Sequence, residues 1–412
     1  MFLKKHAASK ERLDRVAKLY LAYKFLGALY FSYPIFYQFA IQTISPVQVG
    51  IFFSAIGICG FITEVPTGII ADKHGRKLSG LLGMGVLSVA PLIVFFGHIF
   101  SAYLIAAMFY GLGRALLSGA LDSLVYDHKN TSKTMYRKMN SLEITFGQAG
   151  ILASAAAGGL LFSLNQSLPF MAEAITGLAC FFIIAFMDEQ NRTDYIKSTA
   201  SHHQHFIQSM RHLFATPYLR VTVLMGVTFS VMLGMCIQFV NEAAMIEHGF
   251  RPGARGFLIS GAGIITLIIL HVVILRTVKG DMGRILYLTC GAAIAYVFMS
   301  INNTPLFLLG YLLWCCLNAT SSFMRLMIHD RIPGSHRSTI MSNFKALAIL
   351  IGLGASSATG LLVQQAGTPR IAYAVFGAIA CLALLPCAYW LLVYLKEESR
   401  SPNVLPSSNQ DN

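Results

Sequence analysis

Charged residues are scarce in this chain, and acidic residues are the scarcest of them. Only 12% of the 412 residues are Asp, Glu, Lys or Arg, about half the share of an ordinary soluble domain, and 18 acidic residues stand against 31 basic ones. Hydrophobic residues make up 55%, and the mean hydropathy is +0.62. This composition excludes a typical soluble protein and predicts a chain that crosses the lipid bilayer many times.

Several motifs are also missing. The chain has no Gly-x-x-x-x-Gly-Lys-Ser/Thr phosphate loop, which argues against an ATP-driven pump, and no His-Glu-x-x-His or Gly-x-Ser-x-Gly motif of a hydrolase. All eight cysteines fall in apolar segments, so we expect neither disulfides nor a metal site. Histidines between 202 and 212 have no cysteine or carboxylate among them and indicate a solvated linker. We therefore expect a protein that is not an enzyme and has no cofactor.

The basic residues are distributed unevenly along the chain. A net charge of +13 could suggest nucleic-acid binding, but 25 of the 31 Lys and Arg fall in alternate short polar segments and form no continuous face. The intervening loops hold only Arg251, Arg255 and Arg370. Because cytoplasmic loops are the basic ones, both termini are expected in the cytoplasm. Residues 4–18 lack the short apolar core of a cleaved signal peptide, and no nucleic-acid partner is expected.

Length and hydropathy predict an all-α fold with about twelve transmembrane helices in two six-helix halves. We expect a cytoplasmic arm at 1–18, a first bundle at 19–187, a cytoplasmic linker at 188–216, a second bundle at 217–396 and a cytoplasmic tail at 397–412. The first span is expected at 19–41, with a kink at Pro34.

The stretch from Glu64 to Lys77 is the most informative in the chain, because an apolar run from 49 to 71 stops there in a short basic loop. Gly75 permits a sharp turn, Arg76 can reach a carboxylate, and Asp72 can cap a helix or pair with an arginine. The stretch resembles the loop signature of the major facilitator superfamily of secondary transporters, Gly-x-x-x-Asp-x-x-Gly-Arg-Arg/Lys. The matching residues are Gly68, Asp72, Gly75, Arg76 and Lys77.

Landmarks recur at a nearly constant offset, which indicates an internal duplication. Gly75-Arg76 recurs as Gly283-Arg284, without the full motif spacing, and Asp127 and Arg137 recur as Asp330 and Arg337. Two related halves suit alternating access, in which one half rocks against the other. The resemblance implies two six-helix bundles around a central cavity, with Arg76 paired to Asp127 in the outward-open state. The rival interpretation is that these charges only anchor helix ends. The latch candidates are Gly68, Asp72, Gly75, Arg76, Lys77, Asp127, Arg137, Gly283, Arg284, Asp330 and Arg337.

Ionisable residues inside the predicted spans are costly there and are candidates for proton coupling. They are Glu64, Arg114, Asp122, Lys345 and Lys24. Glu64 is expected to lie buried and to take up and release a proton, or else to bond neighbouring helices. Arg114 should face a carboxylate, either Glu64 or Asp122, or an anionic substrate group. Lys24 and Lys345 could instead reach the membrane surface, and Asp122 could serve a helix end.

Aromatic and polar residues of the first and seventh spans could contact an amphiphilic substrate, including a cationic one. They also suit positions that face lipid. These candidates are Tyr30, Tyr33, Phe36, Tyr37, Phe229 and Gln238. Toward the outer ends of the sixth and seventh spans, Glu173 and Glu242 could shape a gate or be solvated helix ends.

Two partial motifs resemble those of bacterial proton-coupled drug exporters: Arg114 precedes Ser118-Gly119, and the fifth span holds Gly147, Gly150, Gly158 and Gly159 without a proline. The resemblance implies proton-coupled efflux of small lipophilic compounds, such as drugs or siderophore-like metabolites, by a monomer in the bacterial inner (plasma) membrane. The alternatives are proton-coupled uptake of an organic nutrient and a receptor that does not transport. The close packing of helices through glycines is the structural interpretation of the fifth span.

Overall fold

The computed structural model describes residues 15–126, 133–189, 213–329, 331–332 and 337–400, and within these ranges helices are joined by short turns without strands. Eleven helices in these ranges are long and apolar enough to cross a membrane, which confirms the predicted polytopic all-α fold. They are Pro46–His74, Arg76–Phe96, Phe100–Val125, Met139–Leu164, Leu168–Ala185, Pro217–Glu247, Pro252–Thr277, Gly280–Ser300, Thr304–His329, Asn343–Ala366 and Arg370–Glu398.

The expected first span is broken rather than continuous. Helix α1 (Arg15–Leu26) ends where the Gly27 amide bonds to the Tyr23 carbonyl, and a short helix, α2 (Phe36–Ala40), begins only after a run of turns. Pro34 has no amide to continue a helix, and Gly27 gives up more backbone freedom in a helix than other residues do. The interruption therefore extends over 27–35, beyond the single kink that Pro34 predicts.

The chain divides into two compact units. Unit 1 holds residues 1–35, 58–195 and 252–260, and unit 2 holds 36–57, 196–251 and 261–412. Each unit is built mainly from one predicted half and takes in a short segment from the other. The predicted linker lies mostly outside the described residues, so the boundary between the halves stays a prediction.

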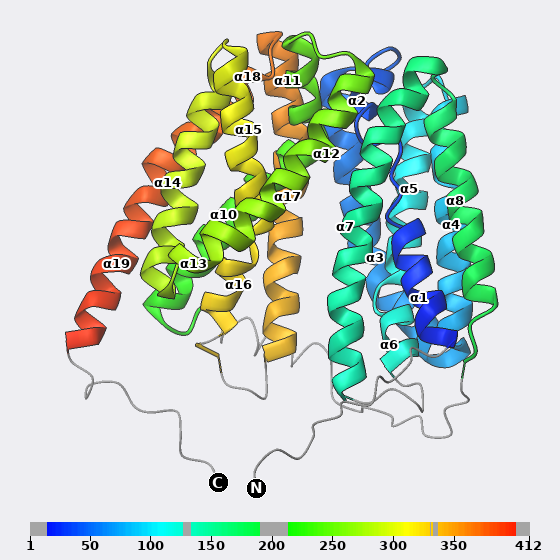
Figure 1. The fold of residues 1–412 in the computed structure, drawn as a ribbon, viewed down its shortest axis with the longest axis horizontal. Helices are drawn as coiled ribbons and strands as arrows, with labels where there is room; N and C mark the ends of the chain where they lie inside the picture. Colours follow the sequence, from blue (N-terminus) through cyan, green and yellow to red (C-terminus); the bar gives the residue numbers. More distant parts are fainter. Residues whose placement is uncertain (1–14, 127–132, 190–212, 330, 333–336, 401–412) are drawn as a thin grey trace, which may run out of the picture. The chain divides into compact units, whose positions relative to one another are not determined.

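In unit 1, α4 packs against α5, α6 and α8, and α1 packs against α7 and α8 (Figure 1). The helices of unit 1 are α1, most of α3 (Pro46–His74), α4 (Arg76–Phe96), α5 (Phe100–Leu117), α6 (Ala120–Tyr126), α7 (Lys133–Leu164), α8 (Leu168–Ala185) and the start of α12 (Pro252–Ile269). The core includes Tyr20, Leu121 and Ile184. Glycines of α7 face the broken first span, since a Cβ on Gly150 would lie 2.5 Å from the Phe25 carbonyl oxygen. This close approach agrees with the packing interpretation of the glycine-rich segment.

In the described part of unit 2, the spans contain three π-helical turns. Its elements are α2, the start of α3, α10 (Pro217–Met235), η1 (Cys236–Val240), α11 (Asn241–Glu247), the rest of α12, η2 (Leu270–Ile274), α13 (Leu275–Thr277), α14 (Gly280–Ser300), α15 (Thr304–Ala319), α16 (Ser322–His329), α17 (Arg337–Ala366), α18 (Arg370–Ile379), η4 (Ala380–Leu384) and α19 (Leu385–Arg400). Buried Glu242 accepts hydrogen bonds from the Tyr37 and Gln38 amides at 2.7 and 2.9 Å. Its carboxylate caps α2 and is not a solvated helix end.

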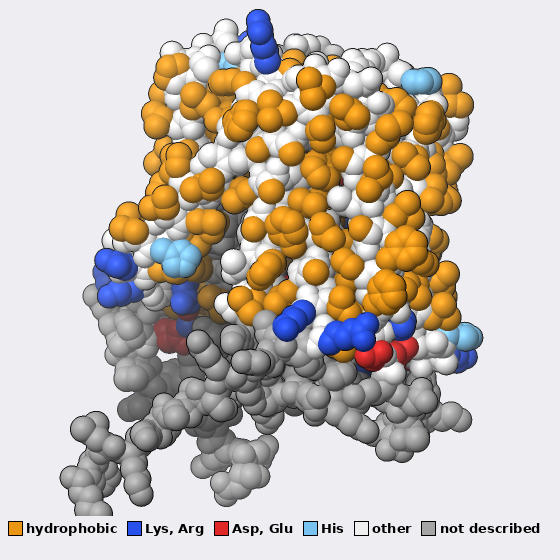
Figure 2. Space-filling view, turned by 45° about the vertical axis from the view of Figure 1, so that its right-hand side comes forward, with side chains coloured by type: hydrophobic (Ala, Val, Ile, Leu, Met, Phe, Trp, Pro, Cys, Tyr) orange, Lys and Arg blue, Asp and Glu red, His pale blue; other side chains and the backbone are white. Residues whose placement is uncertain are grey.

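The outer faces of the helices are apolar. Hydrophobic side chains cover most of the wall in Figure 2, and the visible Lys, Arg, Asp and Glu side chains lie mainly near helix ends. Ile62, Val65 and Leu382 have 65%, 71% and 79% of their surface exposed. In a soluble protein such a surface would aggregate, whereas a bilayer gives it an apolar surrounding.

Candidate functional site

Unit 1 contains a cavity of about 390 Å³ lined by charged, tyrosine and leucine side chains. Helix α1 and the turns after it supply Lys24 and Tyr30, α5 supplies Tyr110 and Arg114, and α8 supplies Glu173. The other lining residues are Tyr23, Leu26, Gly27, Leu29, Met84, Leu87, Leu117, Ser118, Gly119, Leu121, Asp122, Thr176 and Gly177. A pocket with convergent charges inside a membrane-spanning bundle is the best candidate for a functional site.

Lys24 joins two carboxylates at one end of this cavity. Its Nζ lies 2.9 Å from Asp122 Oδ1 and 2.5 Å from Glu143 Oε1, and the Tyr20 hydroxyl lies 2.6 and 2.9 Å from the same two side chains. Tyr20 is one helical turn before Lys24, so both side chains project from one face of α1. We call Tyr20, Lys24, Asp122 and Glu143 the Lys24 cluster. Two carboxylates share one ammonium there, which leaves one negative charge without a matching cation.

Glu173, which also lines the cavity, holds the broken first span in place. Its Oε2 accepts hydrogen bonds from the Ser32 amide and hydroxyl at 3.1 and 2.6 Å, and Tyr110 donates to Oε1 at 3.4 Å. The carboxylate thus supplies an acceptor to an amide that a continuous helix would have satisfied internally. Arg114 lines the same cavity, and its guanidinium forms no hydrogen bond with any residue that the structure describes.

Three of the five predicted coupling residues come together here, and two do not. Lys24, Arg114 and Asp122 line the cavity, but Asp122 pairs with Lys24 and not with Arg114. Glu64 is exposed on α3 and lines neither of the two described pockets, so it is not the buried carboxylate that we expected. Lys345 lies in unit 2, on α17, and lines a different pocket.

Sequence reasoning did not single out Tyr20 or Glu143 as a partner of Lys24. The available signal was the spacing on α1, which places Tyr20 four residues before a lysine that needs a partner. Glu143 lies 123 residues from Tyr20, and nothing in the local sequence indicates that contact. Glu173 was expected to shape an outer gate or to be a solvated helix end, and the structure places it on the lining of the cavity.

The latch motif contains the turn that was predicted for Gly75. Helix α3 ends at His74 and α4 begins at Arg76, with Gly75 between them at φ +103°. The Glu189 carboxylate accepts hydrogen bonds from the Arg76 and Lys77 amides at 2.6 and 3.3 Å, and it thereby caps α4. Both Gly68 and Asp72 are exposed.

The partner predicted for Arg76, Asp127, lies outside the described residues, as does Asp330. Arg137 and Arg337 lie in α7 and α17, but their side chains are not described. The latch therefore stays a prediction. In the second copy, Arg284 forms an ion pair with Asp281 at 3.1 Å, and its guanidinium lies 5.7 Å from the centre of the Phe323 ring. The start of α14 thus keeps its own charge pair, and Gly283 lies between the two partners.

The predicted substrate contacts separate into two groups. Tyr30 lines the cavity and is 39% exposed, and Tyr33 is half-buried. In unit 2, Phe36, Tyr37 and Phe229 are buried, and Gln238 accepts a hydrogen bond from Ser356 at 2.9 Å. The two rings from α2 are stacked, Phe36 on Phe52 at 5.0 Å and Tyr37 on Phe239 at 5.8 Å. Those aromatic side chains form packed core in this conformation, whereas Tyr30 is open to the cavity.

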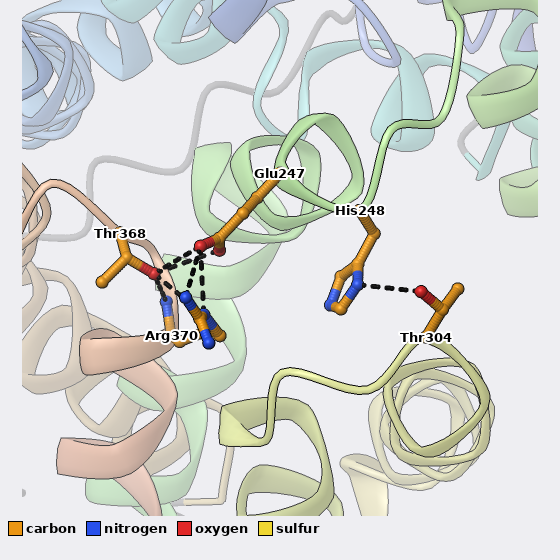
Figure 3. Close-up of polar contacts among 5 residues, drawn as sticks. All are labelled: Glu247, His248, Thr304, Thr368 and Arg370. Atoms are coloured by element: carbon orange, nitrogen blue, oxygen red, sulfur yellow. Dashed lines mark hydrogen bonds and ion pairs between the residues drawn. The ribbon is translucent and has the colours of Figure 1, made fainter.

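At the ends of α11 and α18, unit 2 carries a separate polar network (Figure 3). Arg370 forms an ion pair with Glu247 at 2.9 Å, and the Thr368 hydroxyl donates to the same carboxylate at 2.8 Å. Next to it, His248 Nδ1 lies 3.2 Å from the Thr304 hydroxyl, and the ring stacks on Phe307 with a centroid distance of 4.5 Å. The His248 Nε2 is buried and has no partner among the described residues.

His248 should make the stability of the protein depend on pH. Burial lowers its pKa below the ordinary value of 6.5, Arg370 acts in the same direction, and Glu247 opposes them. A lowered pKa means that folding favours the neutral ring, so its contribution is full above about pH 6.5 and is lost as the pH falls below that. We expect the melting temperature in detergent to fall between pH 7.5 and 5, and to fall less in His248→Phe. An equal fall in the melting temperature of the unmodified protein and of His248→Phe would contradict this role. His98→Gln, which removes a different histidine, is the control.

Comparisons with known proteins agree with this architecture. The family model of the Major Facilitator Superfamily matches residues 19–324. The chain is 23% identical over 369 residues to YxaM of Bacillus subtilis (strain 168), an uncharacterized MFS-type transporter, with 84% of this chain and 87% of that protein covered. It is 22% identical over 290 residues to Multidrug resistance protein 2 of the same organism, with 68% and 71% covered.

Solved structures share the fold. The nucleoside transporter NupG superposes with a TM-score of 0.74 at 12% identity, covering 93% of this chain and all of that one. A D-xylose-proton symporter superposes with a TM-score of 0.69 at 14% identity, covering 90% and 97%. The family match extends over most of the chain and confirms the resemblance drawn from Gly68 to Lys77. YxaM and NupG are named as transporters and not as enzymes. The chain therefore belongs to the major facilitator superfamily of membrane transporters.

Proposed function

We propose that this chain is a proton-coupled exporter of small lipophilic organic compounds, such as drugs or siderophore-like metabolites. It works by alternating access, as a monomer in the bacterial inner membrane, with both termini in the cytoplasm. The distribution of Lys and Arg along the sequence supports this orientation.

The Lys24 cluster is the observation that supports proton coupling. Its one ammonium balances one of two carboxylates, and the second negative charge is the place where a proton binds. With a proton on Asp122 or Glu143, the cluster is neutral, and closing it off from water costs less than when it is charged. Without the proton, the uncompensated carboxylate charge favours the conformation in which the cluster is in contact with water. A carrier whose rocking depends on that charge couples proton movement to transport.

Tyr20 connects the two carboxylates. Its hydroxyl has one proton to donate and lies within hydrogen-bond distance of both side chains, so it bonds to one carboxylate at a time. When a proton arrives on Asp122, the hydroxyl can turn to Glu143, and the reverse holds as well. The proton is thereby shared within the cluster without a large movement of the helices.

Export of lipophilic compounds rests on two further observations. The cavity combines Tyr23, Tyr30 and Tyr110 with leucine side chains, which gives apolar and aromatic surface next to the charges. One of the relatives bears the name Multidrug resistance protein 2. A cavity of about 390 Å³ has the size of a pocket for a small organic molecule.

The test is substrate-driven proton movement in liposomes that contain the purified protein. An interior pH dye reports protons while a panel of lipophilic cations, neutral drugs, organic anions and siderophores is added. We expect at least one compound to move protons in exchange for itself, with the sign of an antiporter. Proton movement in the same direction as the compound would support uptake instead. Silence for every compound that binds the folded protein would contradict transport and favour a receptor.

A further inference from the structure

Unit 2 contains a second pocket, of about 440 Å³, between α16 and α17. Ser322, Arg325, Leu326 and His329 recur on α16 with the spacing of one helical face, and Met341 and Lys345 lie one turn apart on α17. Each helix therefore supplies one wall. The pocket is separate from the cavity that contains the Lys24 cluster, because that cavity belongs to unit 1.

The lining of this pocket is basic. Three of its six residues are Arg325, His329 and Lys345, and no carboxylate from the described ranges lines it. The Arg325 and Lys345 side chains form no ion pair or hydrogen bond with any residue that the structure describes. Both side chains are exposed near the ends of their membrane spans, so their charges are accessible to a bound anion.

Other arginines of unit 2 are neutralised by the fold itself. Arg284 is paired with Asp281 at 3.1 Å, and Arg331, only six residues after Arg325, donates two hydrogen bonds to Glu398 at 2.9 and 2.8 Å. The Arg331 guanidinium also lies 4.2 Å from the centre of the Tyr218 ring. Unlike Arg284 and Arg331, the Arg325 and Lys345 side chains of the α16–α17 pocket have no carboxylate partner among the described residues.

The chemistry of the lining defines the ligand. A guanidinium binds a carboxylate or phosphate with two parallel hydrogen bonds, and the Lys345 ammonium adds a second charge from the facing helix. Leu326 and Met341 supply apolar surface beside these charges. Such a pocket accepts an anionic group that is attached to an apolar body, and it repels a cation of the same size.

We propose that the α16–α17 pocket binds the carboxylate or phosphate group of an amphiphilic anion. The proposal deepens the proposed function, on which it rests for the step from binding to transport, because an exported compound that binds here as well as in the cavity of unit 1 is an organic anion. The same chemistry occurs in the headgroup of an anionic phospholipid. A binding experiment can separate these two sources without any transport measurement.

The experiment follows thermal unfolding of the full-length protein in a neutral detergent while a probe is titrated. The probes are sodium benzoate, inorganic phosphate, benzylamine as a cation of similar size to benzoate, and phosphatidylglycerol in mixed micelles. We expect benzoate or phosphate to raise the melting temperature until it saturates, and benzylamine to have no such effect. In Arg325→Gln/Lys345→Gln, the concentration for half of the shift should rise by about tenfold or more, the change for the loss of one charged contact.

A matched control removes the same charge elsewhere. Arg276→Gln/Lys279→Gln changes two exposed cations of unit 2 that do not line the pocket, and it should keep the unmodified response. A response to phosphatidylglycerol alone, lost only in the pocket variant, assigns the site to a lipid headgroup. No response to any anion, or equal responses in both variants, overturns the proposal. If the double variant does not fold, Arg325→Gln and Lys345→Gln are tested singly, with the same outcomes.

Discussion

Replacing Asp122 by Asn and Glu143 by Gln together is expected to abolish substrate-driven proton movement while the substrate still binds. Both carboxylates contact the same Lys24 ammonium, so either one can hold the proton and a single change leaves the other in place. Each single variant should therefore keep part of the activity, and the double variant should lose it, because neither carboxylate then remains to take up the proton. The liposome assay with an interior pH dye measures the loss.

Controls separate coupling from folding. The double variant leaves Lys24 without its partners, which destabilises a partly buried cation. Lys24→Met added to the two changes removes that charge, so the triple variant should unfold at a higher temperature than the double variant and still move no protons. Glu64→Gln tests the carboxylate that the sequence favoured. If Glu64→Gln alone abolishes proton movement and the double variant does not, the Lys24 cluster is not the coupling site.

Gly75→Ala should cost more stability than any other alanine substitution in the motif. At φ +103° and ψ 147°, the backbone of Gly75 is in a region that is almost confined to glycine. A Cβ there would also lie 2.9 Å from a Glu189 carboxylate oxygen, the group that caps α4. We expect a loss of about 1–3 kcal/mol in the free energy of unfolding.

Gly68→Ala is the matched control for this prediction. Gly68 belongs to the same motif but lies inside α3, where an added Cβ would meet nothing within 4 Å. Alanine is also the better helix former, so stability should stay equal or rise. Thermal unfolding in detergent measures the stability of Gly75→Ala and of Gly68→Ala relative to the unmodified protein. Equal losses at both positions would show that the turn at Gly75 is not the reason for the motif's glycine.

The sequence was sufficient for the fold because lipid imposes a simple rule, a long apolar run for each crossing. It failed at the first span, where hydropathy continues through 27–35 although the helix does not. Hydropathy predicts whether a segment lies in lipid. It does not predict whether the backbone amides of that segment form the hydrogen bonds of a continuous helix. The sequence shows Gly27 and Pro34, which favour a break in the helix. The carboxylate that accepts the freed Ser32 amide belongs to Glu173, 141 residues away in the sequence.

The site could be predicted only in part, for a related reason. An ionisable side chain in a span is costly without a partner. Three of the residues that this rule selects, Lys24, Arg114 and Asp122, line one cavity. The rule does not say which charge the partner is. Glu64 satisfied the same rule, yet its side chain points to the exposed face of α3. Pairing depends on helix rotation and packing, and a single sequence contains no direct record of either.

The broken first span has a consequence for how this protein responds to its surroundings. An intact helix bonds its own amides, so its shape is insensitive to acidity. Here the Ser32 amide is held by Glu173, and the amides of Tyr37 and Gln38 are held by Glu242. A carboxylate that gains a proton is a weaker acceptor. Protonation of Glu173 or Glu242 would therefore weaken the hydrogen bonds that fix this main-chain segment. A continuous transmembrane helix, which bonds its own amides, has no such dependence on protons.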